Sequence, residues 1–288
     1  MNLLEQTKEL CRLYDIKPAR SKGQNFLIEE KIYDDIVAAA DLKSDDVVLE
    51  VGPGLGFLTA KLAKKVKRVI AVELDDKLAE VLHTGLMAQE ILNVEMVNED
   101  ILKILDKPKQ APFLKGSYKI VANLPYNITS IFLRKFLSET ENKPELTVLM
   151  LQKEVAERII AKPGKMSLLA VSVQCYAKPE IMQTVAKENF WPEPKVGSAV
   201  VKIFLHPVPL FNKDKEKDFF RLVKFGFSAK RKMLKNNLAA GFKISQEEAE
   251  KKIIEAGFNP KIRAQELSVA DWLKLFKCFF SASYKPEG

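Results

Sequence analysis

Residues that build metal sites and disulfide frameworks are scarce in this chain of 288 residues. There are two histidines, His83 and His206, and three cysteines, Cys11, Cys175 and Cys278, which stand far apart and form no C-x-x-C pair. Because zinc sites need closely spaced thiol or imidazole ligands, we expect no metal ion. An odd number of scattered thiols is typical of a reducing compartment, so we expect a cytoplasmic protein.

Long apolar runs are also missing. No apolar stretch approaches the roughly 20 residues that a membrane-spanning helix needs. Glu5, Glu9 and Asp15, near the start of the sequence, disfavour a secretory signal and an acid-poor import peptide. The hydrophobic fraction of 47% is ample for a sizeable core, and the length favours one large domain with a smaller one. We therefore expect a protein with no membrane partner.

Negative charge is scarce in one part of the chain. Residues 1–200 contain 28 Lys and Arg against 28 Asp and Glu, whereas residues 201–288 contain 18 against 10. The whole surplus of +8 therefore lies in the C-terminal part. Such segregation favours the docking of a polyanion there. A solvated basic surface without a partner is the alternative, which the segregation weakens.

The most informative stretch is residues 47–59, with the sequence VVLEVGPGLGFLT. Its first five residues are mostly β-branched or apolar, as in a strand buried on both faces of a parallel sheet. Gly52, Gly54 and Gly56 follow at alternate positions, where the missing Cβ lets the backbone turn tightly and lets a ligand lie against it. Apolar residues at helical spacing come next. The stretch predicts a nucleotide-type pocket at the carboxyl edge of the sheet.

The residues around the glycines indicate which ligand this pocket takes. No Gly-Lys-Ser/Thr sequence follows Gly56, which excludes a P-loop, and the third glycine comes one residue too early for a dinucleotide fingerprint. Glu50 ends the strand, and its carboxylate would repel a pyrophosphate but tolerate the sulfonium and ammonium groups of S-adenosylmethionine. The pattern favours S-adenosylmethionine over NAD. A glycine-rich turn without a ligand is the alternative.

Strands and helices alternate along most of the chain, which predicts a doubly wound α/β sheet. We expect strands at 68–74, 93–97, 118–122 and 146–151, with a closing antiparallel hairpin from 168–176 and 198–205. We expect helices at 3–14, 28–40, 76–88, 128–138 and 152–161, and then a run of helices near 214–227, 229–240, 245–256 and 267–281, with Gly241 and Gly257 as helix ends. The predicted domains are a Rossmann-like catalytic domain, 1–207, which includes an N-terminal helix and basic loop, 1–27, and a smaller helical domain, 208–288.

Polar side chains stand at the predicted strand ends. Glu73 lies where a carboxylate can hold a ribose diol by two hydrogen bonds. Asp100, after the third strand, could accept from an adenine amino group, and its neighbour Glu99 is assigned to solvent. These side chains and Asn123 should meet at one edge of the sheet.

The tetrapeptide Asn123-Leu124-Pro125-Tyr126 carries the predicted chemistry. An exocyclic amine is a poor nucleophile because its lone pair is delocalised into the ring, and an Asn oxygen with a backbone carbonyl can accept its two hydrogens and favour a pyramidal nitrogen. Pro125 stiffens the turn, and Tyr126 offers a flat face on which a base can stack. Methyl transfer from a sulfonium needs mainly in-line positioning. An ordinary Asn-Pro turn explains the tetrapeptide alone, but not its place behind a cofactor pocket.

Two further features have a structural alternative of similar weight. In the loop Phe190-Trp191-Pro192-Glu193-Pro194, prolines could present Phe190 to the opposite face of a flipped base, or Phe190 could be a buried anchor. The basic residues of the N-terminal loop, including Lys22, could meet phosphates or be solvated. The basic cluster of the C-terminal part comprises Lys230, Arg231, Lys232 and Lys235.

Several of these segments together resemble the ribosomal RNA adenine N6-dimethyltransferases, and among them the bacterial small-subunit (16S) type. They are residues 23–27, 50–59, 72–75, 123–126, 151–156, 190–196, 230–238 and 259–267, which cover nearly the whole chain in order. The resemblance implies dimethylation of two adjacent adenosines near the 3′ end of 16S rRNA, in an immature small subunit, by a monomer. It implies that the target adenine lies between Tyr126 and Phe190, and that the cofactor contacts are Asn25, Leu27, Gly52, Glu73, Asp100 and Asn123.

The sequence departs from the family pattern in two places. Gly197 stands where family members usually have Asp, and the run after Gly164 is shorter than usual, which puts in doubt how that loop meets RNA. Three other functions compete with the small-subunit enzyme. They are a large-subunit (23S) methyltransferase of the macrolide-resistance type, an assembly or transcription factor with secondary catalysis, and a small-molecule methyltransferase. The basic C-terminal part and Asn236-Asn237 favour the small-subunit over the large-subunit enzyme. The complete tetrapeptide and the retained carboxylates argue against a factor with secondary catalysis, and the charge segregation argues against a small-molecule enzyme.

Overall fold

The computed structural model describes residues 1–18, 24–106, 116–125, 128–140 and 142–280, and they form two compact units. The sheet unit comprises Met1–Glu157 and Ala177–Leu205, and the helical unit comprises Arg158–Tyr176 and His206–Gly288. The second part of the helical unit begins two residues before the predicted boundary at 208. The segment Arg158–Tyr176, which we placed in the catalytic domain, packs in the helical unit instead.

The sheet unit is built on seven strands in the order β4-β3-β2-β5-β6-β9-β7. The strands from β4 to β6 are mutually parallel, while β9 runs antiparallel to β6, and β7 to β9. This confirms the predicted Rossmann-like sheet with an antiparallel closing pair. The bounds are β2 Val47–Val51, β3 Arg68–Glu73, β4 Val94–Asn98, β5 Lys119–Asn123, β6 Leu146–Gln152, β7 Ala177–Val185 and β9 Ser198–Leu205.

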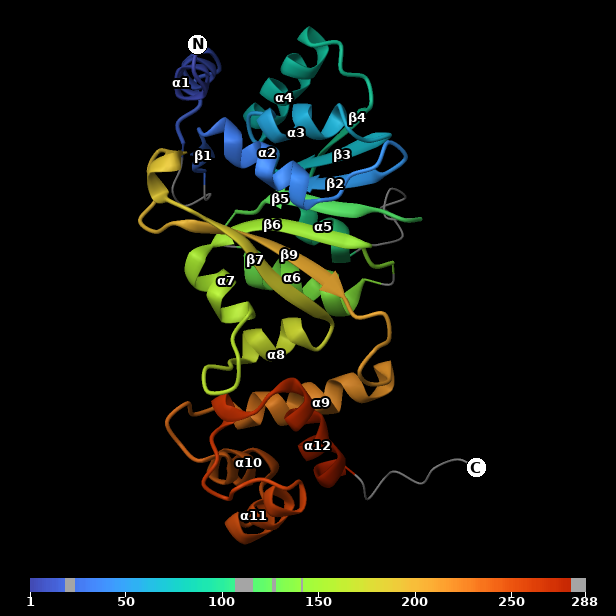
Figure 1. Ribbon diagram of the computed structural model, residues 1–288, viewed down its shortest axis with the longest axis vertical. Helices are drawn as coiled ribbons and strands as arrows, with labels where there is room; N and C mark the ends of the chain where they lie inside the picture. Colours follow the sequence, from blue (N-terminus) through green and yellow to red (C-terminus); the bar gives the residue numbers. More distant parts are fainter. Residues whose placement is uncertain (19–23, 107–115, 126–127, 141, 281–288) are drawn as a thin grey trace. The chain divides into compact units, whose positions relative to one another are not determined.

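Helices cover both faces of this sheet (Figure 1). On one face lie α2 (Glu30–Ala39), α3 (Phe57–Ala63) and α4 (Asp76–Ala88), and on the other α5 (Ile101–Asp106) and α6 (Thr129–Arg134). Because both faces are covered, the central strands are mostly apolar, and Val48, Val69 and Val121 are fully buried in one core with Ile36 of α2 and Leu62 of α3. The buried sheet therefore fixes the positions of the polar residues that lie at the strand ends.

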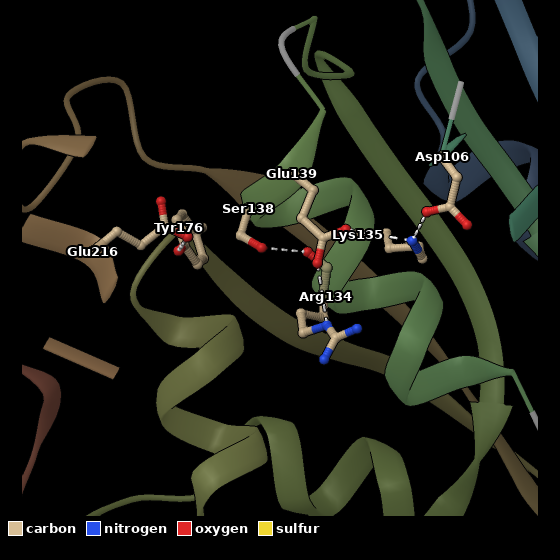
Figure 2. Close-up of polar contacts among 7 residues, drawn as sticks. All are labelled: Asp106, Arg134, Lys135, Ser138, Glu139, Tyr176 and Glu216. Atoms are coloured by element: carbon tan, nitrogen blue, oxygen red, sulfur yellow. Dashed lines mark hydrogen bonds and ion pairs between the residues drawn. The ribbon is translucent and has the colours of Figure 1, made fainter. Parts of the chain in front are cut away.

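Smaller elements complete the sheet unit. They are α1 (Leu3–Leu13), β1 (Phe26–Leu27), the π-helix η4 (Lys135–Glu139), α7 (Lys153–Ile159), η5 (Lys187–Asn189) and β8 (Phe190–Trp191). Lys135 donates to the Asp106 carboxylate at the end of α5 and also pairs with Glu139 at 3.4 Å (Figure 2). These contacts fasten η4, which extends α6, to α5. No helix among the described residues is long and apolar enough to span a bilayer.

The prediction of a strand at 168–176 is wrong. Leu168–Gln174 form α8, whose first turn is capped by the Ser167 hydroxyl accepting from Ala170 N at 3.1 Å. Ala170 and Val171 are buried against the helical unit, so tertiary packing overrides the β preference of this valine-rich run. The hairpin partner of β9 is instead β7, which starts at Ala177.

The helical unit contains α9 (Lys213–Gly226), α10 (Leu234–Phe242), α11 (Gln246–Glu255), the short η6 (Ala264–Glu266) and α12 (Val269–Phe280), in addition to α8. Its core is aromatic and centres on Trp272, which is fully buried. A Cβ on Gly226 would lie 2.3 Å from the Trp272 ring, so this glycine permits the close packing of α12 on α9. Tyr176, just after α8, donates its hydroxyl to Glu216 of α9 at 2.6 Å (Figure 2).

Two details of the predicted helices need correction. The helix predicted at 229–240 begins at Leu234, so Lys230-Arg231-Lys232 lie in the turn between α9 and α10. Gly241 is inside α10, where a Cβ would come within 2.3 Å of the Phe225 ring, and it does not end the helix. Gly257, with φ of 85°, follows Ala256, the residue that caps α11, and marks the end of this helix as predicted.

Candidate active site

A cavity of about 410 Å³ lies at the carboxyl edge of the sheet. The sheet reverses its order of strand addition between β2 and β5, and the cavity is lined by residues after both strands, which is where α/β sheets bind ligands. The structure brings together here all six residues implied as cofactor contacts. They are Asn25, Leu27, Gly52, Glu73, Asp100 and Asn123.

The glycine turn after β2 forms one wall of the cavity. Gly52, Gly54 and Gly56 have φ values of 68°, 58° and 85°, a left-handed backbone that other residues adopt only under strain. A Cβ on Gly56 would meet Leu82 Cδ1 at 2.7 Å, and one on Gly52 would lie 3.4 Å from Pro125 Cδ. The turn therefore needs glycine for its conformation and for its close approach to the segment after β5.

Glu73, the last residue of β3, is 6% exposed. One carboxylate oxygen accepts from Gly54 N at 3.1 Å and the other from Asp75 N at 3.0 Å. Burial raises the pKa of Glu73, and these backbone hydrogen bonds counter the rise in part. The carboxylate thus ties the glycine turn to the start of α4, and its further lone pairs can accept from a ligand diol.

Glu50 is buried more deeply, at 1% exposure, and it also lines the cavity. Its Oε2 has no hydrogen-bond partner among the described residues. Burial, with a smaller contribution from the nearby Glu73, raises the pKa of the Glu50 carboxyl to about 8, although the Thr59 hydroxyl counters the rise in part. A buried carboxylate with one unpartnered oxygen in a cavity wall is suited to a cationic ligand, which agrees with the sequence argument for a sulfonium.

Asp100 and Glu99 follow β4 and differ in exposure. Asp100 is half-buried, and its Oδ1 accepts from Leu102 N at 2.8 Å, which caps α5. Glu99 is exposed and lies 3.8 Å from Lys103, although it also borders the cavity. The half-buried Asp100 is therefore better held to accept a hydrogen bond from a ligand.

Asn123 is the last residue of β5, and Leu124 behind it is buried and donates its N–H to Met150 O at 3.3 Å. The carbonyl of Pro125 accepts from Ile128 N at 3.2 Å, which fixes the turn. Within the part of the chain that the structure describes, no residue hydrogen-bonds to the Asn123 amide, although Asn123 lines the cavity. The amide is available for a substrate. Tyr126 lies outside the described residues.

Phe190 lies in β8, which pairs with β1 in the register Leu27↔Phe190. The Phe190 ring is 2% exposed, packs with Val185 and Val200, and is not among the residues that line the cavity. This position corresponds to the buried-anchor alternative. The β1–β8 pairing nevertheless joins the loop after Phe190 to a strand that borders the cavity.

Among the cavity residues to which the sequence analysis gave no role, three are informative. Leu74 is 66% exposed, which is unusual for a leucine, and with the buried Ile101 it gives the cavity apolar surface beside Glu73. Gln24 donates to Asp75 at 3.2 Å and so ties the N-terminal segment to α4. In a sequence, a leucine at the end of a strand indicates a core position and not a ligand site. Only its exposure in the structure shows that Leu74 belongs to the cavity.

The predicted basic cluster divides in the structure. Lys230, Arg231 and Lys232 are exposed, whereas Lys235 pairs with Glu250 at 2.5 Å and is half-buried, so its charge is already neutralised. The buried Asn237 amide donates to the carbonyls of Gly226 and Ala229 at 2.6 and 3.0 Å, which holds the basic turn in shape. Lys22 lies outside the described residues.

Two other basic loops of the helical unit are linked to this turn in series, one to the turn itself and the other to the segment after Arg263. Gly164 N donates to Gln265 O, and Leu234 N donates to Ile262 O, both at 2.8 Å. The three loops carry exposed cations that form no ion pair with a described residue. They are Lys162, Lys165, Lys230, Arg231, Lys232, Lys261 and Arg263. By sequence, the helical unit holds 20 Lys and Arg against 10 Asp and Glu, and the sheet unit 26 against 28. Dividing the chain into its two structural units therefore separates the charge more completely than dividing it at residue 200.

The parallel sheet, the glycine turn and the polar strand ends define a methyltransferase of the Rossmann-like type. In the described residues no group of three or more His, Cys, Asp and Glu is arranged to hold a metal ion. The chain belongs to the ribosomal RNA adenine dimethylase family, whose model matches residues 17–280. This confirms the family resemblance and identifies the chain as a methyltransferase.

Individual relatives cover most of the chain. The ribosomal RNA small subunit methyltransferase A of Dehalococcoides mccartyi strain CBDB1 is 44% identical over 95% of this chain and 92% of its own length. The enzyme of that name from Alkaliphilus oremlandii is 37% identical over 93% and 94%. Among solved structures, a Plasmodium falciparum dimethyladenosine transferase matches with a TM-score of 0.70 and 27% identity over 87% of this chain and 95% of that one. The 23S rRNA methyltransferase ErmE matches with 0.68 and 27% over 88% and 99%.

Proposed function

We propose that this protein transfers methyl groups from S-adenosylmethionine to N6 of adenines in small-subunit ribosomal RNA. The proposed product is N6,N6-dimethyladenosine at two adjacent positions near the 3′ end of 16S rRNA, formed in the cytoplasm in an immature small subunit. One observation carries the proposal, namely that a single cavity is lined by the glycine turn, by Glu73 and Asp100, and by Asn123. Cofactor groups and a nucleophile-orienting amide therefore share one site.

The cavity suits the proposed cofactor in size and in chemistry. Its volume lies within the range of pockets for small ligands, about 300–1,000 Å³. Glu73 would accept from the ribose hydroxyls, Asp100 from the adenine amino group, and Leu74 and Ile101 would contact the flat base. The methionine end of the cofactor would contact Asn25, Leu27 and Gly52. When bound, the cofactor supplies an electrophilic methyl group on a positively charged sulfur.

The residues after β5 would orient the acceptor nitrogen. The Asn123 oxygen and a backbone carbonyl of the turn would accept the two N6 hydrogens, and the rigid Pro125 turn keeps these acceptors in place. Tyr126 and Phe190 remain the proposed stacking partners of the adenine. For Phe190 this role requires a conformation other than the buried one. Holding the nitrogen in line with the methyl group is the main catalytic contribution that we assign to the protein.

The helical unit would bind RNA through its basic loops. Unpaired cations on three adjoining loops can neutralise phosphates and position the small subunit. Lys162 and Lys165 enter this proposal from the structure. They lie in the loop after α7, which is shorter than the family pattern. Because this short loop still carries two exposed cations, it can still contact RNA.

The large-subunit methyltransferase of the macrolide-resistance type remains the competing enzyme, because the ErmE structure matches this chain over 99% of the ErmE chain and 88% of this one. Sequence identity favours the small-subunit function, at 44% to D. mccartyi methyltransferase A against 27% to ErmE. A third possibility, an assembly factor with secondary catalysis, is disfavoured by the complete cavity.

The deciding experiment is mass spectrometry of ribosomal RNA from cells with and without this gene. We expect dimethyladenosine to disappear from 16S rRNA and 23S rRNA to be unchanged. Purified protein should then restore the modification on isolated small subunits of the deletion strain, with labelled S-adenosylmethionine as donor. Loss of a 23S methyladenosine would favour the competing enzyme, and no change in either RNA would contradict both.

A further inference from the structure

The cavity contains a buried acid whose charge no described cation balances. Glu50 is 1% exposed, lines the cavity and has an Oε2 without a hydrogen-bond partner among the described residues. Burying such a group without a partner is costly unless it is protonated or meets a ligand. Yet Glu50 sits at the carboxyl end of β2, directly below the glycine turn, where a hydrophobic residue would continue the strand pattern.

The groups that face Glu50 come from three elements. Tyr33 of α2 donates its hydroxyl to Leu27 O at 3.0 Å, so this proton is already used. Thr59 of α3 is buried, and Glu73 of β3 is a second acid. Burial first, and Glu73 in addition, raise the pKa of Glu50 to about 8. In the empty protein at neutral pH, Glu50 is therefore mostly protonated and neutral.

We propose that Glu50 distinguishes the cationic methyl donor from its neutral product by exchanging a proton with solvent. This inference rests on the proposed function, which places S-adenosylmethionine in the cavity. A positive ligand favours the ionised carboxylate, so Glu50 releases a proton as the donor binds. During transfer, adenine N6 gains the methyl group and loses a proton to solvent, and the electron pair of the broken S–CH₃ bond stays on sulfur. Glu50 then faces a neutral thioether and takes up a proton from solvent.

The consequence is easier exchange of spent cofactor for fresh cofactor. Dimethylation consumes two donors for each adenine, so S-adenosylhomocysteine must leave before the second transfer. A carboxylate that is ionised only beside a positive sulfur attracts the donor and has no such attraction for the product. Glu50 is thus a specificity-determining residue for the cofactor.

The test counts protons in a binding titration. Isothermal titration at pH 7 in buffers of high and low ionisation enthalpy gives the number of protons released per ligand bound. The ligands are S-adenosylmethionine, S-adenosylhomocysteine and sinefungin, in which a protonated amine replaces the methyl-bearing sulfonium. We expect the wild-type protein to release between about half and one proton more with either cation than with the neutral product.

Variants then assign this proton. Glu50→Gln should abolish the difference and reduce the preference for donor over product by roughly tenfold. In the wild type that preference should rise between pH 7 and 9, and in Glu50→Gln it should be flat. Glu50→Asp should retain part of the linkage. Glu99→Gln, which alters an exposed acid at the same cavity, should behave as wild type.

The outcomes separate this inference from the proposed function. If no ligand binds at all, the proposed function is wrong. If S-adenosylmethionine binds but proton release equals that with S-adenosylhomocysteine, Glu50 does not sense the sulfur charge. The same conclusion holds if Glu99→Gln, and not Glu50→Gln, removes the difference. The comparison of the three ligands on wild-type protein needs no variant, so it stands even if Glu50→Gln fails to fold.

Discussion

At the scale of single residues, Glu73 has both a structural and a binding task. Its two oxygens hold Gly54 N and Asp75 N, and its position suits a ribose diol. We expect Glu73→Ala to weaken S-adenosylmethionine binding by about 1.5–3 kcal/mol, the value of charge-assisted hydrogen bonds. Calorimetry measures this, and Glu73→Gln, which keeps the volume, separates the lost charge from a collapsed turn. Unchanged affinity in both variants would remove Glu73 from the site.

Asn123 should act on the chemistry more than on binding. Its amide has no partner among the described residues and borders the cavity, so its removal costs little in folding. We expect Asn123→Ala to slow methyl transfer by about 10²–10³-fold, as with other orienting donors and acceptors, and to leave RNA affinity nearly unchanged. Single-turnover assays measure the rate. Glu99→Ala is the comparison, and a full rate in Asn123→Ala would contradict the acceptor role.

Glu50 should make the stability of the empty protein depend on pH. Its pKa is about 8 in the folded chain against an ordinary value near 4.5, so between these pH values the folded state binds the extra proton. The contribution of Glu50 to stability therefore falls as pH rises through this window and is constant above it.

Thermal melts of wild type and Glu50→Gln should show this effect. The glutamine cannot ionise, so the variant should gain in melting temperature relative to wild type from pH 5 to pH 8. Saturation with S-adenosylmethionine should reduce that gain. Parallel curves across this range would mean that Glu50 does not titrate in the folded protein.

At the scale of elements, the glycine turn after β2 positions both the cofactor and the catalytic segment. Gly52 has φ of 68°, so an alanine there strains the backbone. The added methyl group would also lie 3.4 Å from Pro125 Cδ and so crowd the segment after Asn123. We expect Gly52→Ala to destabilise the protein by about 1–3 kcal/mol and to weaken cofactor binding.

Gly85 is the matched control for this substitution. It lies within α4, where a Cβ meets nothing within 4 Å, and alanine is the better helix former. Gly85→Ala should therefore raise stability by up to about 1 kcal/mol and leave cofactor affinity unchanged. Denaturant titrations of both variants measure the two effects. A Gly52→Ala protein as stable as Gly85→Ala would show that the turn tolerates a side chain.

At the scale of the whole molecule, charge is divided between the two units. If the basic loops bind RNA phosphates, affinity falls with salt by a slope of roughly 0.9 for each phosphate neutralised, the B-DNA figure. Replacing Lys230, Arg231 and Lys232 by Ala should weaken binding to small subunits and flatten the slope by up to about 3, with cofactor affinity intact.

Lys235→Ala is the control for this triple variant, because Lys235 is paired with Glu250. It should leave the salt slope unchanged, contrary to the role that the sequence alone suggested. A salt titration of the three proteins decides the matter. If the triple variant binds as wild type at every salt concentration, the basic turn is solvated and RNA docks elsewhere.

A truncation near Leu210, just after the predicted domain boundary, is unsuitable for isolating the cofactor domain. The buried side chains of α8 pack with Phe219 and Leu222 of α9 and would be exposed by the cut. Full-length variants are therefore the better test of how the two units divide the work.

The sequence by itself determined the sheet, its cofactor edge and the family. Residues 47–59, Glu73, Asp100 and Asn123 are local signals, because an apolar strand pattern, a glycine-rich turn and polar residues at strand ends can be read from residues close in sequence. For the same reason β2 to β6 and β9 were predicted to within one residue at each end, and α4 correctly at both ends, whereas β7 was missed.

Only the tertiary structure decided the remaining features, because each depends on contacts between distant segments. Leu168–Gln174 form a helix because their apolar side chains pack with those of α9. Phe190 is buried where its strand pairs with Leu27, and the charge of Lys235 is balanced by an ion pair with Glu250. Leu74 was exposed at the cavity, the loop of Lys162 was bonded to Gln265, and Glu50 Oε2 was left without a hydrogen-bond partner among the described residues. A sequence lists such groups, but burial and pairing, which set their chemistry, arise only when the chain folds.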